Sequence, residues 1–239
     1  MKRKKTGKKS DKKNDLPRRD EFLAAALNRF ARYGYAATST RDICADVGIV
    51  HSAIYNYFPS KEAVLLAIES REMARMQGGL DALLDNCAGA PPLTRLALAI
   101  HYTLRVAVTG RAAWHLMAEM LRSLALRHRL DVVIRRDRYE GTIRALLEAA
   151  IAAGALPRQD VRLASLHIFG IAGGIAGWYR PDGEYSPDAL VEHSMAACLR
   201  LIGAKPSAVA ALQTNRSALA SGPDSAAAEA RGTRAKSNR

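Results

Sequence analysis

A group of hydrogen-bonding side chains lies between two breaks in the chain, Gly48 and Pro59. Ile54 and Phe58 are four residues apart, which marks one buried face of a short helix. The opposite face then carries small and polar side chains, namely Val50, His51, Ser52, Tyr55 and Asn56. Side chains of these types can enter the major groove of DNA and bond to the edges of bases. An ordinary three-helix packing unit with a polar surface would show the same pattern, so both interpretations stay open here.

Two earlier helices would position this segment. Apolar residues recur every three to four positions from Arg18 to Tyr33, and Gly34 follows as a typical helix end. A cluster of good N-cap residues then leads into a short helix over residues 41–47, which Gly48 closes. A third helical segment follows over residues 50–58. Two short helices joined through a glycine turn and supported by an earlier helix predict a helix-turn-helix unit.

The stretch from Gly34 to Leu65, GYAATSTRDICADVGIVHSAIYNYFPSKEAVL, resembles the DNA-binding domain of TetR-family transcriptional regulators. The matching positions, at the spacing of the family, are Phe30, Gly34, Tyr35, Thr38, Arg41, Asp42, Ile43, Gly48, Tyr55, Tyr57, Phe58, Ser60, Lys61 and Glu62. The resemblance implies a DNA-binding domain over residues 17–77. It also implies a homodimer that places two such helices in successive major grooves of a near-palindromic DNA operator.

The same resemblance implies roles for individual residues. Those that would hold phosphates are Thr38, Ser39, Arg41, Tyr55, Tyr57 and Lys61. Those that would lie near bases are His51, Ser52 and Asn56. Val50 departs from the small polar residue usual in the family, and a thymine methyl group is the contact that it could make.

The net charge of +13 lies mostly at the two ends of the chain. Residues 1–19 carry ten basic and two acidic side chains, and residues 204–239 carry six and two. Their polar composition is typical of disorder, so we expect a disordered basic arm over residues 1–16 and a disordered tail over 204–239. Residues 20–70 alone have a net charge of −2 and attract a polyanion weakly. We therefore expect the arm to lie along DNA phosphates, although a merely solubilising extension has the same composition.

Beyond Ser60 the pattern is helical throughout. Helices are expected near residues 60–87, 91–109, 111–126, 127–153, 160–179 and 186–203. No strand-like alternation of useful length occurs, so the predicted fold class is all-α. The three-helix helix-turn-helix domain would be followed by a helical effector-binding and dimerisation domain over residues 78–203.

The helix expected over residues 160–179 contains four glycines, Gly170, Gly173, Gly174 and Gly177. Each costs about 1 kcal/mol inside a helix, which points to a close helix neighbour or a bulky ligand beside them. TetR-like proteins dimerise through their last two long helices, here residues 160–179 and 186–203, and we favour this homodimer.

The uncharged run within residues 160–179 is at the short limit of a membrane span, and a buried helix with no membrane partner is the preferred interpretation.

Large side chains on the middle helices would enclose a small-molecule effector, by the same resemblance. They are Tyr102, Trp114, Met117, Leu121, Tyr139, Phe169 and Trp178. For each of them a place in the ordinary core is the alternative.

Short matches at Gly48-Ile49-Val50 and at residues 177–183 are also similar to TetR-like regulators of lipid and sterol-ring catabolism that respond to acyl-CoA thioesters. The expected function is a repressor that leaves its operator when an effector selects another conformation.

Other classes of protein fit less well. The three cysteines, Cys44, Cys87 and Cys198, form no metal-binding or disulfide pattern, and a reducing cytoplasm suits them. No secretory signal is expected, because no apolar segment follows the basic N-terminus. No nucleophile elbow, HExxH sequence or phosphate-binding glycine loop occurs, so we expect no enzyme activity, cofactor or metal.

Two alternatives to a specific regulator remain open. A non-specific architectural nucleic-acid-binding protein would need only the basic tails, whereas the expected regulator would be cytoplasmic and associated with the nucleoid. A ligand carrier with a degenerate DNA-binding head is also conceivable. The intact set of Tyr55, Tyr57 and Lys61 argues against the carrier.

Overall fold

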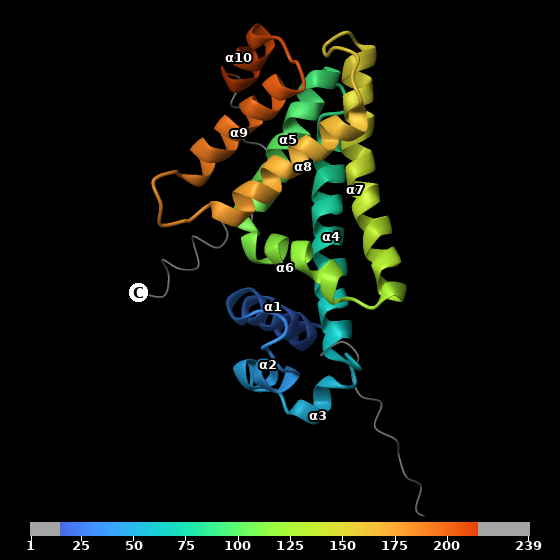
Figure 1. Ribbon diagram of the computed structural model, residues 1–239, viewed down its shortest axis with the longest axis vertical. Helices are drawn as coiled ribbons and strands as arrows, with labels where there is room; N and C mark the ends of the chain where they lie inside the picture. Colours follow the sequence, from blue (N-terminus) through green and yellow to red (C-terminus); the bar gives the residue numbers. More distant parts are fainter. Residues whose placement is uncertain (1–14, 215–239) are drawn as a thin grey trace, which may run out of the picture. The chain divides into compact units, whose positions relative to one another are not determined.

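The computed structural model describes residues 15–214, with side chains from Arg19 onward except those of residues 118, 119 and 121–123. The expected basic arm and the last part of the expected tail lie outside the described residues. Every secondary-structure element in residues 15–214 is a helix, which confirms the all-α fold (Figure 1). The described residues divide into two compact units, one up to Ile68 and one from Glu69 onward.

The first unit contains α1 (Asp15–Tyr33), α2 (Thr40–Val47), α3 (His51–Ile54) and the start of α4 (Lys61–Asn86). The apolar stripes predicted from the sequence meet in its core, where Phe22, Leu23, Ile43 and Ile54 are almost fully buried. The Phe22 ring stacks on Phe58 at the end of the α3 segment, with 5.7 Å between ring centroids. These contacts fix the outward direction of the polar faces of α2 and α3.

The third helix is shorter than the predicted segment 50–58. Regular helix ends at Ile54, and residues 55–57 form a turn in which the N–H groups of both Tyr57 and Phe58 bond to the Ile54 carbonyl at 2.9 Å. The physical reason is Pro59, because the residue before a proline is disfavoured in helical geometry. The segment therefore tightens and ends at Phe58.

The second unit continues α4 and adds six helices. They are α5 (Pro92–Thr109), α6 (Arg111–Ser123), α7 (Leu126–Ala152), α8 (Val161–Trp178), α9 (Pro187–Leu201) and α10 (Pro206–Thr214). α5 is the central helix, with Leu96, Ile100 and Leu104 fully buried. α7, α8 and α9 all pack against it, and α8 crosses it in Figure 1.

The two compact units divide after Ile68, where Glu69 already bonds to α7, and the expected domain boundary at residue 77 lies within α4, which runs through both units. One other expectation is corrected by the structure. The tail expected to be disordered from residue 204 instead forms α10 over its first part. Gly203, with φ +83°, turns the chain after α9, and the buried Val209 holds α10 against it.

α8 is buried on one face only, whereas the sequence predicted a buried helix. Ile168, Ala172 and Ile175 face the core, but Leu163 and Leu166 are exposed. Within residues 15–214, α8 is the one helix with the length and apolar composition of a membrane span, and 33% of it is buried inside the protein. Its outer face therefore has room for a helical neighbour.

Candidate nucleic-acid interface

The start of α2 is held by reciprocal hydrogen bonds between Ser39 and Asp42. The Ser39 hydroxyl accepts from the Asp42 N–H at 3.2 Å, and the Asp42 carboxylate accepts from the Ser39 N–H at 3.0 Å. These bonds to Ser39 hold the pKa of Asp42 below its usual value. As at every helix start, the first N–H groups, those of Thr40 and Arg41, have no partner within the helix. Their partial positive charge suits a phosphate.

An ion pair between Arg29 and Asp46 fixes α2 against α1. The Arg29 guanidinium donates through Nε and Nη2 to the two carboxylate oxygens of Asp46. The hydrogen bond from Arg29 lowers the pKa of Asp46. The two-point contact sets the orientation of α2 as well as its position.

The turn between α2 and α3 depends on Gly48. This residue has φ +65°, a left-handed conformation that glycine adopts without strain. Val50 then precedes α3 as its N-cap residue without a side-chain cap, and 72% of its surface is exposed. Ser52 and Asn56 are also exposed on this unit, as predicted. The segment around α3 thus exposes one apolar side chain, Val50, and two polar ones, Ser52 and Asn56.

His51 is held in place from both sides. Its Nε2 lies 3.0 Å from the Thr40 hydroxyl, and its ring meets the edge of the Tyr55 ring with 5.1 Å between centroids. The orientation of the imidazole is therefore fixed before any ligand binds. Sequence reasoning missed Thr40, because its bond to a residue eleven positions away appears only once α2 and α3 are folded together.

Two of the predicted phosphate contacts have structural roles instead. Thr38 is only 2% exposed, and its hydroxyl donates to the Gly34 carbonyl at 2.9 Å. The Lys61 ammonium donates to the carbonyls of Tyr35 (2.9 Å), Thr38 (3.0 Å) and Ala36 (3.3 Å). An ammonium has three N–H groups, so these carbonyls use its donor capacity. Both side chains brace the loop between α1 and α2.

Two of the other phosphate candidates, Ser39 and Tyr55, border one shallow hollow, and Arg41 and Tyr57 lie outside its lining. It is lined by residues 36–40, Tyr55, Pro59, Ser60 and Lys61. The hollow brings together the start of α2, the turn after α3 and the start of α4. Arg41 and Tyr55 are exposed, whereas Tyr57 is half-buried.

The predicted effector residues gather only in part. The buried Tyr139 hydroxyl lies 2.9 Å from the Thr103 hydroxyl, and its ring centroid lies 6.0 Å from that of Phe169. Burial raises the pKa of Tyr139, which keeps its hydroxyl neutral. The Tyr102 hydroxyl lies so close to Gly79 that a side chain there would overlap with it. Met117 is also buried, and all these residues lie in the second unit.

Trp178 does not belong to that group, because 54% of its surface is exposed at the end of α8. The side chain of Leu121 lies outside the described residues. Trp114 faces Gly173 on α8 instead, since a Cβ at Gly173 would lie 3.5 Å from the indole nitrogen. The effector prediction is thus corrected for Trp178.

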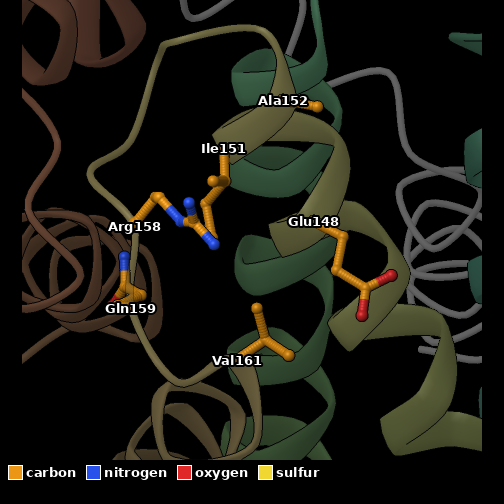
Figure 2. A pocket seen from close by; sticks show the side chains of 6 residues that line it. All are labelled: Glu148, Ile151, Ala152, Arg158, Gln159 and Val161. Atoms are coloured by element: carbon orange, nitrogen blue, oxygen red, sulfur yellow. The ribbon is translucent and has the colours of Figure 1, made fainter.

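A different hollow lies at the end of α7. It is lined by Glu148, Ile151, Ala152, Arg158, Gln159 and Val161. Figure 2 shows Glu148 and Arg158 on opposite sides of it, with Val161 between them. None of the predicted effector residues lines it, and sequence reasoning gave no sign of it.

No group of three or more His, Cys, Asp or Glu side chains suited to a metal ion occurs within residues 15–214. The cysteines are free, and burial raises the pKa of the Cys198 thiol to about 12. The features that the described part does show are a braced helix-turn-helix unit and a separate helical unit. This combination defines a helix-turn-helix DNA-binding protein.

Two family models match adjacent parts of the chain. Residues 22–68 match "Bacterial regulatory proteins, tetR family", and residues 89–202 match "Tetracyclin repressor-like, C-terminal domain". The protein belongs to the TetR family of transcriptional regulators, whose members bind operator DNA and small-molecule effectors.

Several characterised proteins are similar over most of their length. The HTH-type transcriptional repressor KstR2 of Mycolicibacterium smegmatis is 26% identical, over 76% of this chain and 89% of that protein. The fatty acid metabolism regulator protein of Bacillus subtilis is 24% identical, over 74% and 92%. The structure of the ketosteroid transcriptional regulator KstR2 of Mycobacterium tuberculosis matches with a TM-score of 0.70 at 25% identity, over 79% and 95%.

Proposed function

We propose that the protein is a cytoplasmic, homodimeric repressor that binds a palindromic operator through α2 and α3 and is released by a lipid-like effector. The observation that carries the proposal is the Thr40–His51 contact at 3.0 Å, which fixes the outward face of α3 before DNA binds. Preorganised side chains lose less conformational entropy on binding than mobile ones. A rigid face of this kind supports sequence recognition rather than purely electrostatic attraction.

The outward side chains divide into two roles. Ser52 and Asn56 offer hydrogen bonds to base edges, and Val50 offers an apolar contact to a thymine methyl group. Tyr55 and the residues at the start of α2 line the hollow, the exposed Arg41 follows them in α2, and these groups suit phosphates. Phosphate contacts set the register, and α3 then supplies the selectivity for sequence.

The dimer is proposed to form through α8 and α9. A Cβ placed on Gly170, Gly174 or Gly177 would meet nothing within 4 Å, so these glycines lie on the open face of α8. Glycines on one face allow two helices to approach closely, and the exposed Leu163 and Leu166 beside them supply apolar area to bury. A close helix neighbour therefore explains three of the four glycines, whereas a Cβ at Gly173 would make an ordinary contact with Trp114.

The proposed effector is an acyl-CoA or a related lipid-like molecule. Support comes from the relatives, which are named for fatty acid metabolism and ketosteroid regulation, and from the short sequence matches near Gly48 and Trp178. The buried Tyr102 and Tyr139 and the half-buried Phe169 offer aromatic surface to an apolar chain. By population shift, a ligand that prefers another spacing of the two α3 helices would release the DNA.

The effector is tested with acyl-CoAs of graded chain length. An acyl-CoA that binds should raise the melting temperature and release operator DNA, while coenzyme A alone, the matched control, should do neither. If no chain length changes the melting temperature or the operator occupancy, the acyl-CoA proposal is wrong. A DNA-binding regulator with another effector would then remain.

The basic arm is proposed to supply non-specific affinity for DNA. The net charge of −2 on residues 20–70 gives no overall attraction to DNA, and the ten basic and two acidic side chains of residues 1–19 bring the total for residues 1–70 to +6. Deletion of residues 2–15 should flatten the slope of log K against log salt by about 0.9 for each phosphate that the arm neutralises. An unchanged slope would refute the arm's role and leave the α3 interface untouched.

A further inference from the structure

A buried carboxylate on α4 forms an ion pair within the second unit. Glu69 is only 1% exposed, and Arg135 of α7 donates to one of its oxygens, Oε2, through Nε at 2.8 Å and also through Nη2. The other oxygen, Oε1, is buried and has no hydrogen-bond partner among the described residues. A buried charged acceptor without a donor is costly, so a second donor would stabilise this carboxylate.

The next residue of α7 can supply that donor. Consecutive helix residues point about 100° apart, so Arg136 reaches a different neighbour from Arg135. The half-buried Arg136 guanidinium donates through Nη2 to the Met117 carbonyl of α6. Burial lowers the pKa of Arg136, and the charge of Glu69 acts in the opposite direction. Glu69 is therefore close enough to attract Arg136, although no hydrogen bond joins these two described side chains.

We propose that Arg136 is a two-position switch. In this structure it ties α6 to α7, and in its second position it donates to Oε1 of Glu69 and releases α6. The proposal rests on the proposed function, because α6 also carries Trp114 and Met117, two of the predicted effector residues. A ligand that displaces α6 would carry the Met117 carbonyl away from Arg136. Since Glu69 lies on α4, which continues into the first unit, the switch links α6 to that helix.

Opposing effects bring the two positions close in free energy, as a switch requires. The Met117 carbonyl lies inside α6, so it keeps its bond to the N–H four residues later when Arg136 leaves. Donation to Oε1 satisfies the orphaned oxygen of Glu69. Against this gain, Arg136 would then lie beside the Arg135 guanidinium, and like charges repel at short distance.

Glu69→Gln separates the switch from the ion pair. The amide oxygen of glutamine can still accept from Arg135, whereas its NH₂ group, in the place of Oε1, cannot accept from Arg136. This variant should therefore hold Arg136 at α6. Arg136→Met removes the donor and should free α6. Arg138→Gln is the matched control, because it replaces an exposed arginine of the same helix.

Hydrogen exchange in the full chain, with the α6 amides compared with those of α5, measures how often α6 opens. Relative exchange of α6 should be slower in Glu69→Gln than in wild type and about tenfold faster in Arg136→Met, while the control exchanges like wild type. A purely structural network predicts faster exchange in both variants, because each would lose a buried interaction. Faster or unchanged exchange in Glu69→Gln therefore overturns the switch.

Operator binding separates this proposal from the proposed function. If the switch acts on α4, Glu69→Gln and Arg136→Met should shift operator affinity in opposite directions. Opposite effects on exchange with equal operator affinities would support the switch within the second unit and overturn its link to DNA binding. If wild type does not prefer a palindromic site at all, the proposed function is wrong, and the exchange result still decides on the switch.

Discussion

The Lys61 ammonium lies 2.9 Å from the carbonyl oxygen of Tyr35 and 4.4 Å from the centroid of the Tyr35 ring. One side chain at the start of α4 thus holds the loop before α2 by a hydrogen bond and a cation–π contact. Burial of the Tyr35 ring, with Glu62 nearby, raises the pKa of Tyr35 and keeps its hydroxyl neutral. The position of α2 therefore depends on α4 through Lys61.

Replacing Lys61 with Met should destabilise the protein by about 1–3 kcal/mol, because three carbonyl groups lose a charged donor. Urea unfolding of the full chain measures the loss. Arg41→Ala is the matched control, since this exposed residue should affect affinity for DNA and not stability. Weaker DNA binding by Lys61→Met at unchanged stability would show instead that Lys61 acts as a phosphate contact.

Replacing Thr40 with Val should release His51 from its hydrogen bond while preserving the shape of the side chain. We expect operator affinity to fall by about tenfold, or about 1.4 kcal/mol, because the α3 face is no longer preorganised. Affinity for random DNA should stay the same. Fluorescence anisotropy with both DNAs measures the difference, and Thr109→Val on α5 is a control that removes a hydroxyl hydrogen-bonded within the second unit. An equal loss on both DNAs would argue against the positioning role of Thr40.

Replacing Gly174 with Leu should block close approach on the open face of α8 and yield a monomer with little operator affinity. Gly78→Leu is the matched control, because a Cβ at that α4 glycine also meets nothing within 4 Å. Size-exclusion chromatography with light scattering gives the masses. If the Gly174→Leu protein stays dimeric, the dimer interface does not include this face of α8.

His101 predicts a dependence of stability on pH. Burial, and secondarily Arg105, lowers the pKa of this half-buried imidazole from 6.5 to about 4. The unfolded chain binds a proton below pH 6.5, whereas the folded protein does so only near pH 4. Stability should therefore fall as the pH drops from 6.5 to 4, by about 2 kcal/mol. Urea unfolding at several pH values should show a smaller fall in His101→Leu, and an identical fall in both proteins would contradict the assignment.

The sequence predicted the elements that have strong local signals. Apolar spacing, Gly34 and Gly48 placed α1 and α2 within a few residues, and the outward positions of Ser52 and Asn56 followed from the buried Ile54. Amphipathic periodicity is a local property, so it survives folding. α3 is shorter than the apolar spacing predicts, because Pro59 disfavours helical geometry at Phe58 and the segment tightens before it.

The sequence could not predict contacts that depend on tertiary packing. Thr38 and Lys61 resemble phosphate contacts by position, yet their polar atoms turn inward to carbonyls of the loop between α1 and α2. The Trp178 side chain points outward because α8 has only one buried face. The exposure of Leu126, Leu130 and Ile134 on α7 also could not be predicted, since it depends on which face of α7 the second unit covers.

The most direct test of the central claim compares affinity for a selected palindromic site with affinity for a scrambled site of the same composition, at one fixed salt concentration. If α3 reads bases, the selected site should bind about 10³-fold or more tightly, and Ser52→Ala with Asn56→Ala should reduce that ratio more than they reduce binding to the scrambled site. A ratio near one, unchanged by these substitutions, would mean that the protein binds DNA by charge alone and would contradict the account.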